Sequence, residues 1–116
     1  MSDEAEPIMT AKPTTDEAFE AIALRFRALS DPLRLKILYN LVGGECTVTE
    51  LIARTGGSQS NVSKHLSTLL AHRLVHRRRA GTSAHYSIAD ESILDLCNRV
   101  CDGIDRDLEK RRNAFR

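Results

Sequence analysis

The stretch that most constrains the fold of this chain is TVTELIARTGGSQSNVSKHL, which occupies residues 47–66. Thr47 and Glu50 have the spacing of a capping box, in which a hydroxyl and a carboxylate pair with the free amides that begin a helix. The glycine pair at 56–57 stops that helix after about two turns, and Ser58 is placed to cap the next one. Two short helices joined by a tight glycine turn predict a helix-turn-helix unit.

Two further helices are predicted before this unit. Apolar residues recur at helical spacing over 16–29, where Thr14 or Thr15 provides a suitable cap. After this first helix, Asp31 suits the N-cap position of a second helix and Pro32 suits its first turn. A glycine pair then ends the second helix.

Two short extended segments, 74–79 and 83–88, surround a glycine turn and predict a β-hairpin. A last amphipathic helix is predicted over 90–110. We therefore expect a mainly α fold with a small β-hairpin, a winged helix-turn-helix in the order α-α-α-α-β-β-α. The chain is expected to divide into a disordered acidic tail, one winged helix-turn-helix domain and a basic tail, at 1–13, 14–110 and 111–116.

Charge is unevenly distributed along the 116 residues, although their formal net charge is only +1. Residues 51–89 contain six Lys and Arg, all four His and no acidic residue. Positive charge clustered in this way favours a polyanionic partner and therefore nucleic acid. A solvated basic surface is the alternative interpretation.

The predicted helix over 59–72 has an apolar side set by Val62, Leu66 and Leu69. Its other side carries short polar groups, which allow a helix to lie close in the major groove of DNA. There Gln can read adenine, and Ser can contact a base edge or a phosphate. Serine also simply solvates helix surfaces, which is the alternative. The residues of this helix and its cap that are predicted to contact DNA are Ser58, Gln59, Ser60, Asn61, Ser63, Lys64, His65 and Ser67.

The predicted hairpin adds further candidates for DNA contact. Arg77 and Arg79 share one side of their strand and are expected to reach phosphates, while Arg78 faces the other way. Thr82 and His85 complete the predicted DNA-contacting set. In this basic region histidines are expected to serve as polar or phosphate-contacting groups, and not as metal ligands.

Three segments together resemble the ArsR/SmtB family of bacterial metal- and redox-responsive repressors: ALSDPLRLKIL (28–38), SQSNVSKHL (58–66) and RRRAGTSAHYSI (77–88). The resemblance implies a homodimer that pairs through its first and last helices and binds double-stranded DNA at a short inverted repeat. It also implies a recognition helix at 59–72, a wing at 74–88, and an inducer that weakens DNA binding.

The positions that the family uses for sensing are not intact in this chain. The stretch matching the family's Cys-Val-Cys motif is Thr-Val-Thr at 47–49, and Cys46 comes one residue before it. The metal site on the last helix keeps Asp90 but lacks its other ligands. Tyr39 stands where the persulfide sensors of the family have a cysteine in the second helix.

The remaining candidates for a sensing site are Cys97, Cys101 and Cys46. Cys97 and Cys101 are four residues apart on the last predicted helix, so they share one face, and their Cβ separation of about 5–6 Å disfavours a direct disulfide. Soft thiolates select soft ions. With a third sulfur, from Cys46 or a partner chain, the pair suits As(III) or Sb(III), and four sulfurs across a dimer suit Zn or Cd.

Two alternatives to metal binding stay open for these cysteines. Leu94, Cys97, Cys101, Ile104 and Leu108 follow a heptad spacing, so the thiols can be packing residues of a dimer seam. A redox or persulfide sensor is the second alternative, if neighbouring Arg99 lowers a thiol pKa and a disulfide forms with Cys46 or a partner chain.

Other function classes fit the sequence less well. We expect no enzyme, because the chain has no nucleophile–base pair, phosphate loop or HExxH spacing. A dimeric module that binds protein and not DNA is disfavoured by the basic region. An odd number of cysteines, the lack of a secretory start and the absence of a long apolar run predict a cytoplasmic protein.

Overall fold

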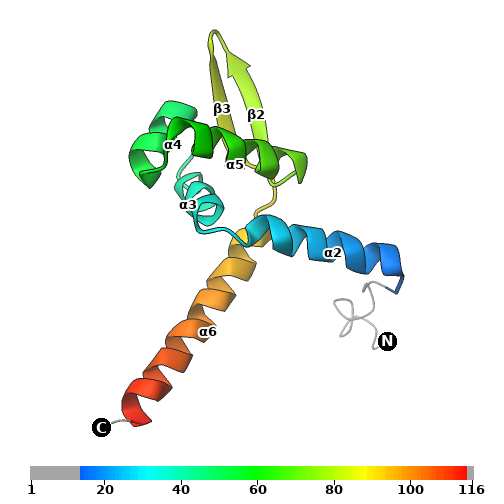
Figure 1. Ribbon diagram of the computed structural model, residues 1–116, viewed down its shortest axis with the longest axis vertical. Coiled ribbons are helices and arrows are strands. Elements are labelled where there is room, and N and C mark those ends of the chain that lie inside the picture. The colour runs from blue at the N-terminus through cyan, green and yellow to red at the C-terminus, as the bar shows by residue number, and fades with distance from the viewer. Residues whose placement is uncertain (1–13, 115–116) are drawn as a thin grey trace, which may run out of the picture.

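A computed structural model describes residues 14–114 of the chain. The predicted N-terminal tail therefore lies outside the described residues. In chain order the elements are α2 (Asp16–Leu29), α3 (Pro32–Asn40), β1 (Cys46–Thr47), α4 (Val48–Thr55), α5 (Gln59–Ala71), β2 (Val75–Ala80), β3 (Ser83–Ile88) and α6 (Ser92–Ala114). This is the predicted mainly helical fold with a small antiparallel hairpin, a winged helix-turn-helix (Figure 1).

The helices begin at the residues that the capping signals predict. The Thr15 side chain accepts a hydrogen bond from the first turn of α2, and Asp31 Oδ1 accepts one from the Leu33 amide at 2.8 Å. The predicted capping box of α4 is complete, since Thr47 and Glu50 bond reciprocally. Each of these bonds satisfies an amide that has no partner inside its own helix.

The turn between α4 and α5 depends on its two glycines. Gly56 adopts the left-handed conformation that ends α4, with φ of 79°. A Cβ atom on Gly57 would lie 3.0 Å from Val62 Cγ2 and 3.2 Å from Leu33 Cδ2. The backbone of this turn is therefore in direct contact with side chains of α3 and α5.

A single hydrophobic core lies between α3, α4, α5 and the base of the hairpin. Its residues, all at most 8% exposed, are Ala28, Leu29, Ile37, Leu38, Leu41, Cys46, Leu51, Val62, Leu66, Leu69, Leu74, Val75, Tyr86 and Ile93. Burial of these apolar groups is the main stabilising contribution to the fold.

The sheet has three strands in the order β1-β3-β2, all antiparallel. The sequence predicted the hairpin of β2 and β3, with Gly81 in the turn at φ of 64°. It did not predict β1, which consists of two residues that pair Cys46 with Tyr86 and Thr47 with His85. A strand this short carries no periodic signal and is set by tertiary pairing alone.

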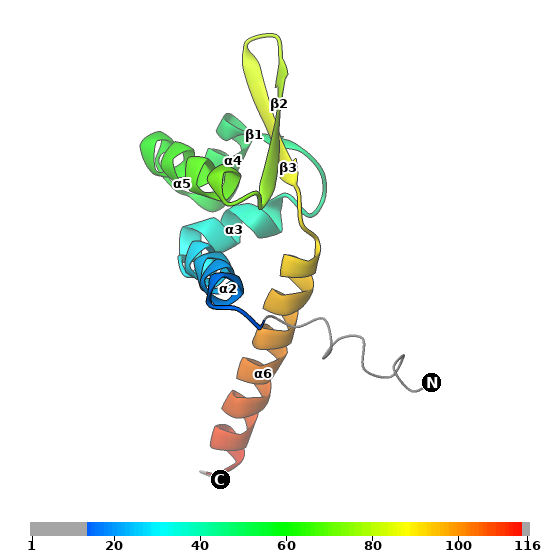
Figure 2. The same ribbon diagram turned by 90° about the vertical axis from the view of Figure 1, so that its right-hand side faces the viewer.

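Helix α6 and the hairpin extend in opposite directions from the helical body, as both views show (Figures 1 and 2). Helix α6 continues to Ala114, so the predicted end at residue 110 was wrong. Ion pairs between Arg111 and Asp107 at 3.3 Å and between Arg112 and Glu109 at 3.6 Å support these last turns. None of the helices in residues 14–114 is long and apolar enough to cross a membrane.

Large apolar side chains remain exposed on the two helices that flank the core. On α2 and α6 these are Phe19, Ile22, Leu24, Phe26, Val100, Ile104 and Leu108, each at least 39% exposed. Such a concentration of apolar surface on a chain of this size is typical of an interaction surface.

Candidate nucleic-acid interface and thiol pocket

Helix α5 presents a polar face backed by the core. Val62, Leu66 and Leu69 are at most 1% exposed and fix the rotation of the helix. The exposed residues of this helix and its cap are Ser58, Gln59, Ser60, Asn61, Ser63, Lys64 and Ser67. Ser58 uses its hydroxyl as the cap, accepting from the Asn61 amide at 3.2 Å. Seven of the eight residues predicted on this surface are thus open to solvent.

His65 is the exception, because it points toward α3. Its side chain is only 15% exposed, its Nδ1 lies 2.8 Å from Nη1 of Arg34, and its Nε2 lies 3.7 Å from Oδ1 of Asp31. His65 is therefore directed away from the exposed face of α5, and its contact with DNA stays a prediction. The apolar stripe alone could not reveal this, because His65 is adjacent to Leu66 and lies at the margin between the two faces. Its contacts with Arg34 and Asp31 connect α5 to the start of α3.

The wing arginines separate as predicted. Arg77 and Arg79 are exposed, and they share a strand face. Arg78 is held by Glu45, whose Oε1 lies 2.7 Å from its Nη2, and this hydrogen bond lowers the pKa of Glu45. Thr82 is exposed at the hairpin turn.

His85 lies on the other side of the wing from Arg77 and Arg79. It stands directly opposite Arg78 in the sheet, and residues directly opposite in an antiparallel pair share a face. His85 is therefore not brought together with Arg77 and Arg79. Glu45, which comes from outside the acid-free region, was missed by the sequence reasoning.

Cys46 is a core residue. It is 0% exposed, its thiol donates to the Asn40 carbonyl at 3.5 Å, and its Sγ accepts a hydrogen bond from Arg54 at 3.1 Å. Burial raises the pKa of this thiol, and the Arg54 guanidinium partly opposes that effect. Cys46 thus behaves as a small apolar residue with satisfied contacts.

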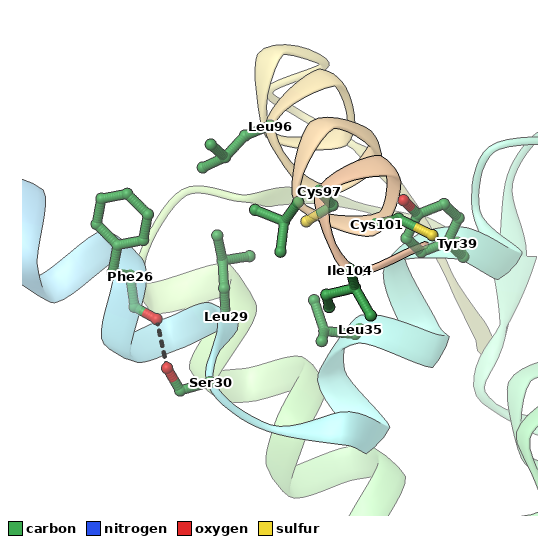
Figure 3. Close-up of a pocket in the computed structure, with 10 residues that line it drawn as sticks. Phe26, Leu29, Ser30, Leu35, Tyr39, Leu96, Cys97, Cys101 and Ile104 are labelled. Atoms are coloured by element: carbon green, nitrogen blue, oxygen red, sulfur yellow. Dashed lines mark hydrogen bonds between the residues drawn. The ribbon is translucent and has the colours of Figure 1, made fainter. Parts of the chain in front are cut away.

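Cys97 and Cys101 line a pocket of about 410 Å³ between α2, α3 and α6. The lining consists of Phe26, Leu29, Ser30, Leu35, Tyr39, Leu96, Cys97, Val100, Cys101 and Ile104. Figure 3 shows the Cys101 sulfur directed toward Tyr39. Both thiols line the pocket, but Cys97 is half-buried and Cys101 is exposed to solvent.

Tyr39 is the pocket residue whose role the sequence did not indicate. Its hydroxyl donates to Asn98 Oδ1 at 2.7 Å, which ties α3 to α6. Burial, followed by the nearby Cys97 and Cys101, raises the pKa of Tyr39. Its place between two helices is a tertiary property. The sequence drew attention to Tyr39 only because it stands where the persulfide sensors of the family have a cysteine.

The thiol chemistry of Cys97 differs from the expectation that Arg99 would activate it. Burial raises the pKa of the Cys97 thiol, and no neighbouring cation is among the causes. Arg99 is exposed and comes two residues later, about 200° around the helix. The half-buried thiol is therefore protonated at neutral pH.

The donor set does not form a complete metal centre within one subunit. Among residues 14–114, no three His, Cys, Asp or Glu side chains are arranged to hold a metal ion. Cys46 is therefore not placed to be a third sulfur for Cys97 and Cys101 of the same chain, which leaves a partner chain as the other source considered from the sequence. One subunit offers two sulfurs, which is half of a tetrahedral zinc or cadmium site.

Comparisons with known proteins agree with this architecture. Residues 31–77 match the sequence profile of the bacterial regulatory protein arsR family. The "Probable mercury resistance operon repressor" of Streptomyces lividans is 45% identical over 71 residues, which are 61% of this chain and 57% of that protein. The chain thus matches less than two thirds of the length of that relative.

Other similarities extend further. The nodulation protein NolR of Rhizobium meliloti is 37% identical over 90 residues, which cover 78% of this chain and 74% of that protein. The homodimeric winged helix-turn-helix DNA-binding domain of Mb0332 from Mycobacterium bovis has a TM-score of 0.72 and 32% identity. That match covers 84% of this chain and 93% of the domain. The chain belongs to the ArsR family of bacterial regulatory proteins.

Proposed function

We propose that this chain is a cytoplasmic, homodimeric transcriptional repressor. It binds an inverted-repeat operator in double-stranded DNA through α5 and the wing, and it releases DNA when Cys97 and Cys101 take up a soft metal or metalloid. The observation that carries the DNA-binding part is the exposed, acid-free polar face of α5 above a fully buried apolar side.

The chemistry of the α5 face supports contact with a duplex. Its exposed side chains are mostly short, so the helix backbone can approach the floor of a major groove. Gln59 lies in the first turn, where the recognition helices of this motif contact base edges. Lys64, Arg77 and Arg79 are exposed and supply phosphate contacts.

The exposed apolar surface of α2 and α6 supports the homodimer. Val100, Ile104 and Leu108 are about half exposed on α6, and Phe19 and Phe26 are about half exposed on α2. A second copy of the chain would cover this surface and set the separation of its two α5 helices. The structurally similar Mycobacterium bovis domain is homodimeric.

The inducer part rests on the paired thiols. Cys97 and Cys101 provide two soft ligands on one face of α6, next to the proposed dimer surface. As(III) and Sb(III) are the favoured inducers, and a third sulfur would come from the partner chain. Zinc or cadmium would need both subunits to complete four ligands.

Cysteine oxidation or persulfide formation is the second candidate mode of induction. The exposure of Cys101 favours it, because that thiol is open to oxidants. A bridge to Cys46 of the same chain does not fit, since Cys46 is 0% exposed inside the core. The remaining route is a bridge between two subunits.

A salt titration of promoter binding tests the DNA-binding part. We expect Lys64→Ala to weaken binding similarly for all sequences and to reduce the salt slope by about 1. The matched control is Lys36→Ala, which removes an exposed lysine of α3 outside the proposed surface. Binding that ignores sequence and stays weak at low salt would contradict the proposal.

Release from the promoter tests the inducer part. As(III), Sb(III), Cd(II), Zn(II), Hg(II) and a persulfide donor are each titrated into the protein–DNA complex. We expect Cys97→Ser and Cys101→Ser to abolish the response, while Cys46→Ala retains it. A retained response in the Cys97→Ser/Cys101→Ser double variant would leave both residues with a packing role only.

A further inference from the structure

Helix α5, which carries the proposed DNA contacts, is joined to α3 by one directional side-chain contact. Its apolar side is held by burial, which is non-directional. Among residues 14–114, the only side-chain hydrogen bond between α5 and another helix joins His65 to Arg34, with Nδ1 and Nη1 2.8 Å apart. His65 lies midway along α5 and its side chain is only 15% exposed. This contact is therefore placed to fix the orientation of the whole helix.

The guanidinium of Arg34 is bonded at the same time to the end of α2. Its Nε donates to the Ala28 carbonyl at 2.6 Å, and its Nη2 donates to the Arg27 carbonyl at 3.3 Å. Carbonyls in the last turn of a helix have no partner inside that helix, and a cation is favoured beside them. Helix α3, which carries Arg34, lies between α5 and α2 (Figure 2). One rigid, planar group thus connects the end of α2 to the middle of α5.

The hydrogen-bonding roles in this contact follow from the chemistry of the two side chains. Arginine can only donate, so Nδ1 of His65 must accept and carries no proton while the contact persists. Nε2 then carries the ring proton and faces Asp31 Oδ1 at 3.7 Å. A residue that replaces His65 without loss of this contact must therefore offer an acceptor near the position of Nδ1.

We propose that His65 and Arg34 are positioning residues for operator binding, because together they set the orientation of α5 from the end of α2. His65 acts here through Arg34 and not through a contact with DNA. Since α2 belongs to the proposed dimer surface, the same contact relates the arrangement of the dimer to the direction of its recognition helices. This inference rests on the proposed DNA-binding function and names the residues that orient its recognition helix.

The first test removes the contact and leaves the exposed face of α5 unchanged. His65→Leu removes the acceptor, whereas His65→Asn restores one, since the Asn Oδ1 lies close to the former position of Nδ1. Arg34→Lys keeps the positive charge, but an ammonium group lacks the planar fork that bonds both helices. The matched control is His72→Leu, which replaces the histidine at the C-cap of α5, about two turns from His65.

Fluorescence anisotropy compares the variants on the promoter duplex and on a shuffled duplex of the same length and composition, at equal salt. We expect His65→Leu to weaken promoter binding by about tenfold and shuffled-duplex binding by less than about twofold. The reason is that a change in the orientation of α5 affects base contacts more than the attraction of phosphates. His65→Asn should recover to within about threefold of the native chain, and His72→Leu should bind as the native chain does.

A double-mutant cycle separates positioning from direct contact with DNA. Arg34→Lys should weaken promoter binding about as much as His65→Leu, and the double variant should be no weaker than the weaker-binding single variant. Circular dichroism checks the fold, and sedimentation equilibrium checks that the dimer constant is unchanged. Losses that multiply in the double variant would indicate that His65 contacts DNA independently and would overturn the proposal. Native promoter affinity in a folded His65→Leu variant would do the same.

The second test uses no DNA and begins with the native chain. Nitrogen-15 NMR of the histidine-labelled protein near neutral pH reports which ring nitrogen of His65 carries the proton. We expect the proton on Nε2 and an Nδ1 resonance that shifts in Arg34→Lys. A proton on Nδ1 would exclude the hydrogen bond from Arg34, and the proposal with it, even if His65→Leu does not fold.

The two proposals fail in different measurements. A native chain that binds its promoter no better than the shuffled duplex would contradict the repressor proposal, and this inference would fall with it. A native chain that prefers its promoter, with a preference that His65→Leu and Arg34→Lys both leave unchanged, would contradict the positioning role alone.

Discussion

The two halves of this molecule differ in how well their apolar side chains are covered. The half formed by α3, α4, α5 and the hairpin has a closed core, where Ile37, Leu51 and Leu69 are 0% exposed. The half formed by α2 and α6 leaves Phe19, Phe26 and other large apolar side chains about half exposed. The same chain therefore contains a helix-turn-helix unit with a closed core and an apolar surface that the chain itself does not cover. We therefore expect substitutions in the core to affect folding and substitutions on the exposed surface to affect the proposed assembly.

The largest expected effect comes from creating a cavity in the buried core. Leu69→Ala should lower the free energy of unfolding by about 2–5 kcal/mol, since it removes a fully buried side chain and leaves a cavity. Urea unfolding at fixed protein concentration measures this loss. A cost below that of an exposed substitution such as Val42→Ala would show that the core is not closed.

A charge on the exposed apolar surface of α2 and α6 should weaken the proposed assembly and leave folding intact. Ile104→Glu is expected to raise the dimer dissociation constant by about 100-fold, because it places a carboxylate in an apolar contact. Sedimentation equilibrium measures the constant, and circular dichroism checks the fold. The matched control is Val42→Glu, which introduces a charge at an apolar residue of similar exposure that lies outside α2 and α6. Equal effects of the two variants would show that Ile104 of α6 is not part of the dimer surface.

Asp31 lies where the two halves join, and its contribution should depend on pH. Amide hydrogen bonds, first that of Arg34, hold the pKa of Asp31 below its ordinary value of 3.8. The carboxylate therefore stabilises the fold fully above pH 3.8, and this stabilisation is lost as the pH falls through the lowered pKa. Asp31→Ala should cost about 1 kcal/mol at pH 7. Urea unfolding at pH 7 and at pH 3 should show that the difference in unfolding free energy between the native chain and Asp31→Ala is smaller at pH 3. An equal difference at both pH values would show that the charge of the Asp31 carboxylate is not its cause.

The smallest expected effect lies at the end of α5. Arg73 adopts φ of 61°, and the Leu74 amide bonds the Leu69 carbonyl at 2.9 Å, which is a helix stop usually made by glycine. Arg73→Gly should raise the free energy of unfolding by about 0.5–1 kcal/mol through relief of this backbone conformation. Thermal unfolding measures the change, and destabilisation would mean that contacts of the arginine outweigh its strain.

The parts of this fold that the sequence predicted are those with local causes. The caps at Thr15, Asp31, Thr47 and Ser58 depend on residues within four positions, and all four are present. The hairpin was predicted for the same reason, because its turn glycine separates two extended segments. Strand β1 has no such local cause and was missed.

The candidate site was less predictable because its geometry joins distant segments. Helical spacing put Cys97 and Cys101 on one face, but it could not show that Cys46 is enclosed in the core or that Tyr39 adjoins the pair. Likewise, the inward direction of His65 depends on Arg34, which is 31 residues earlier in the chain. Such contacts follow from packing and not from periodicity.

The close approach of Gly57 to Leu33 and Val62 has a consequence for the proposed mode of DNA binding. A Cβ atom would have no room at Gly57, although Gly56 has open space around it, so the turn packs directly against α3 and α5 at Gly57. In the proposed dimer, the fit to DNA depends on the separation of the two α5 helices. The half-site spacing of the operator then corresponds, in the proposed dimer, to the separation of these two helices.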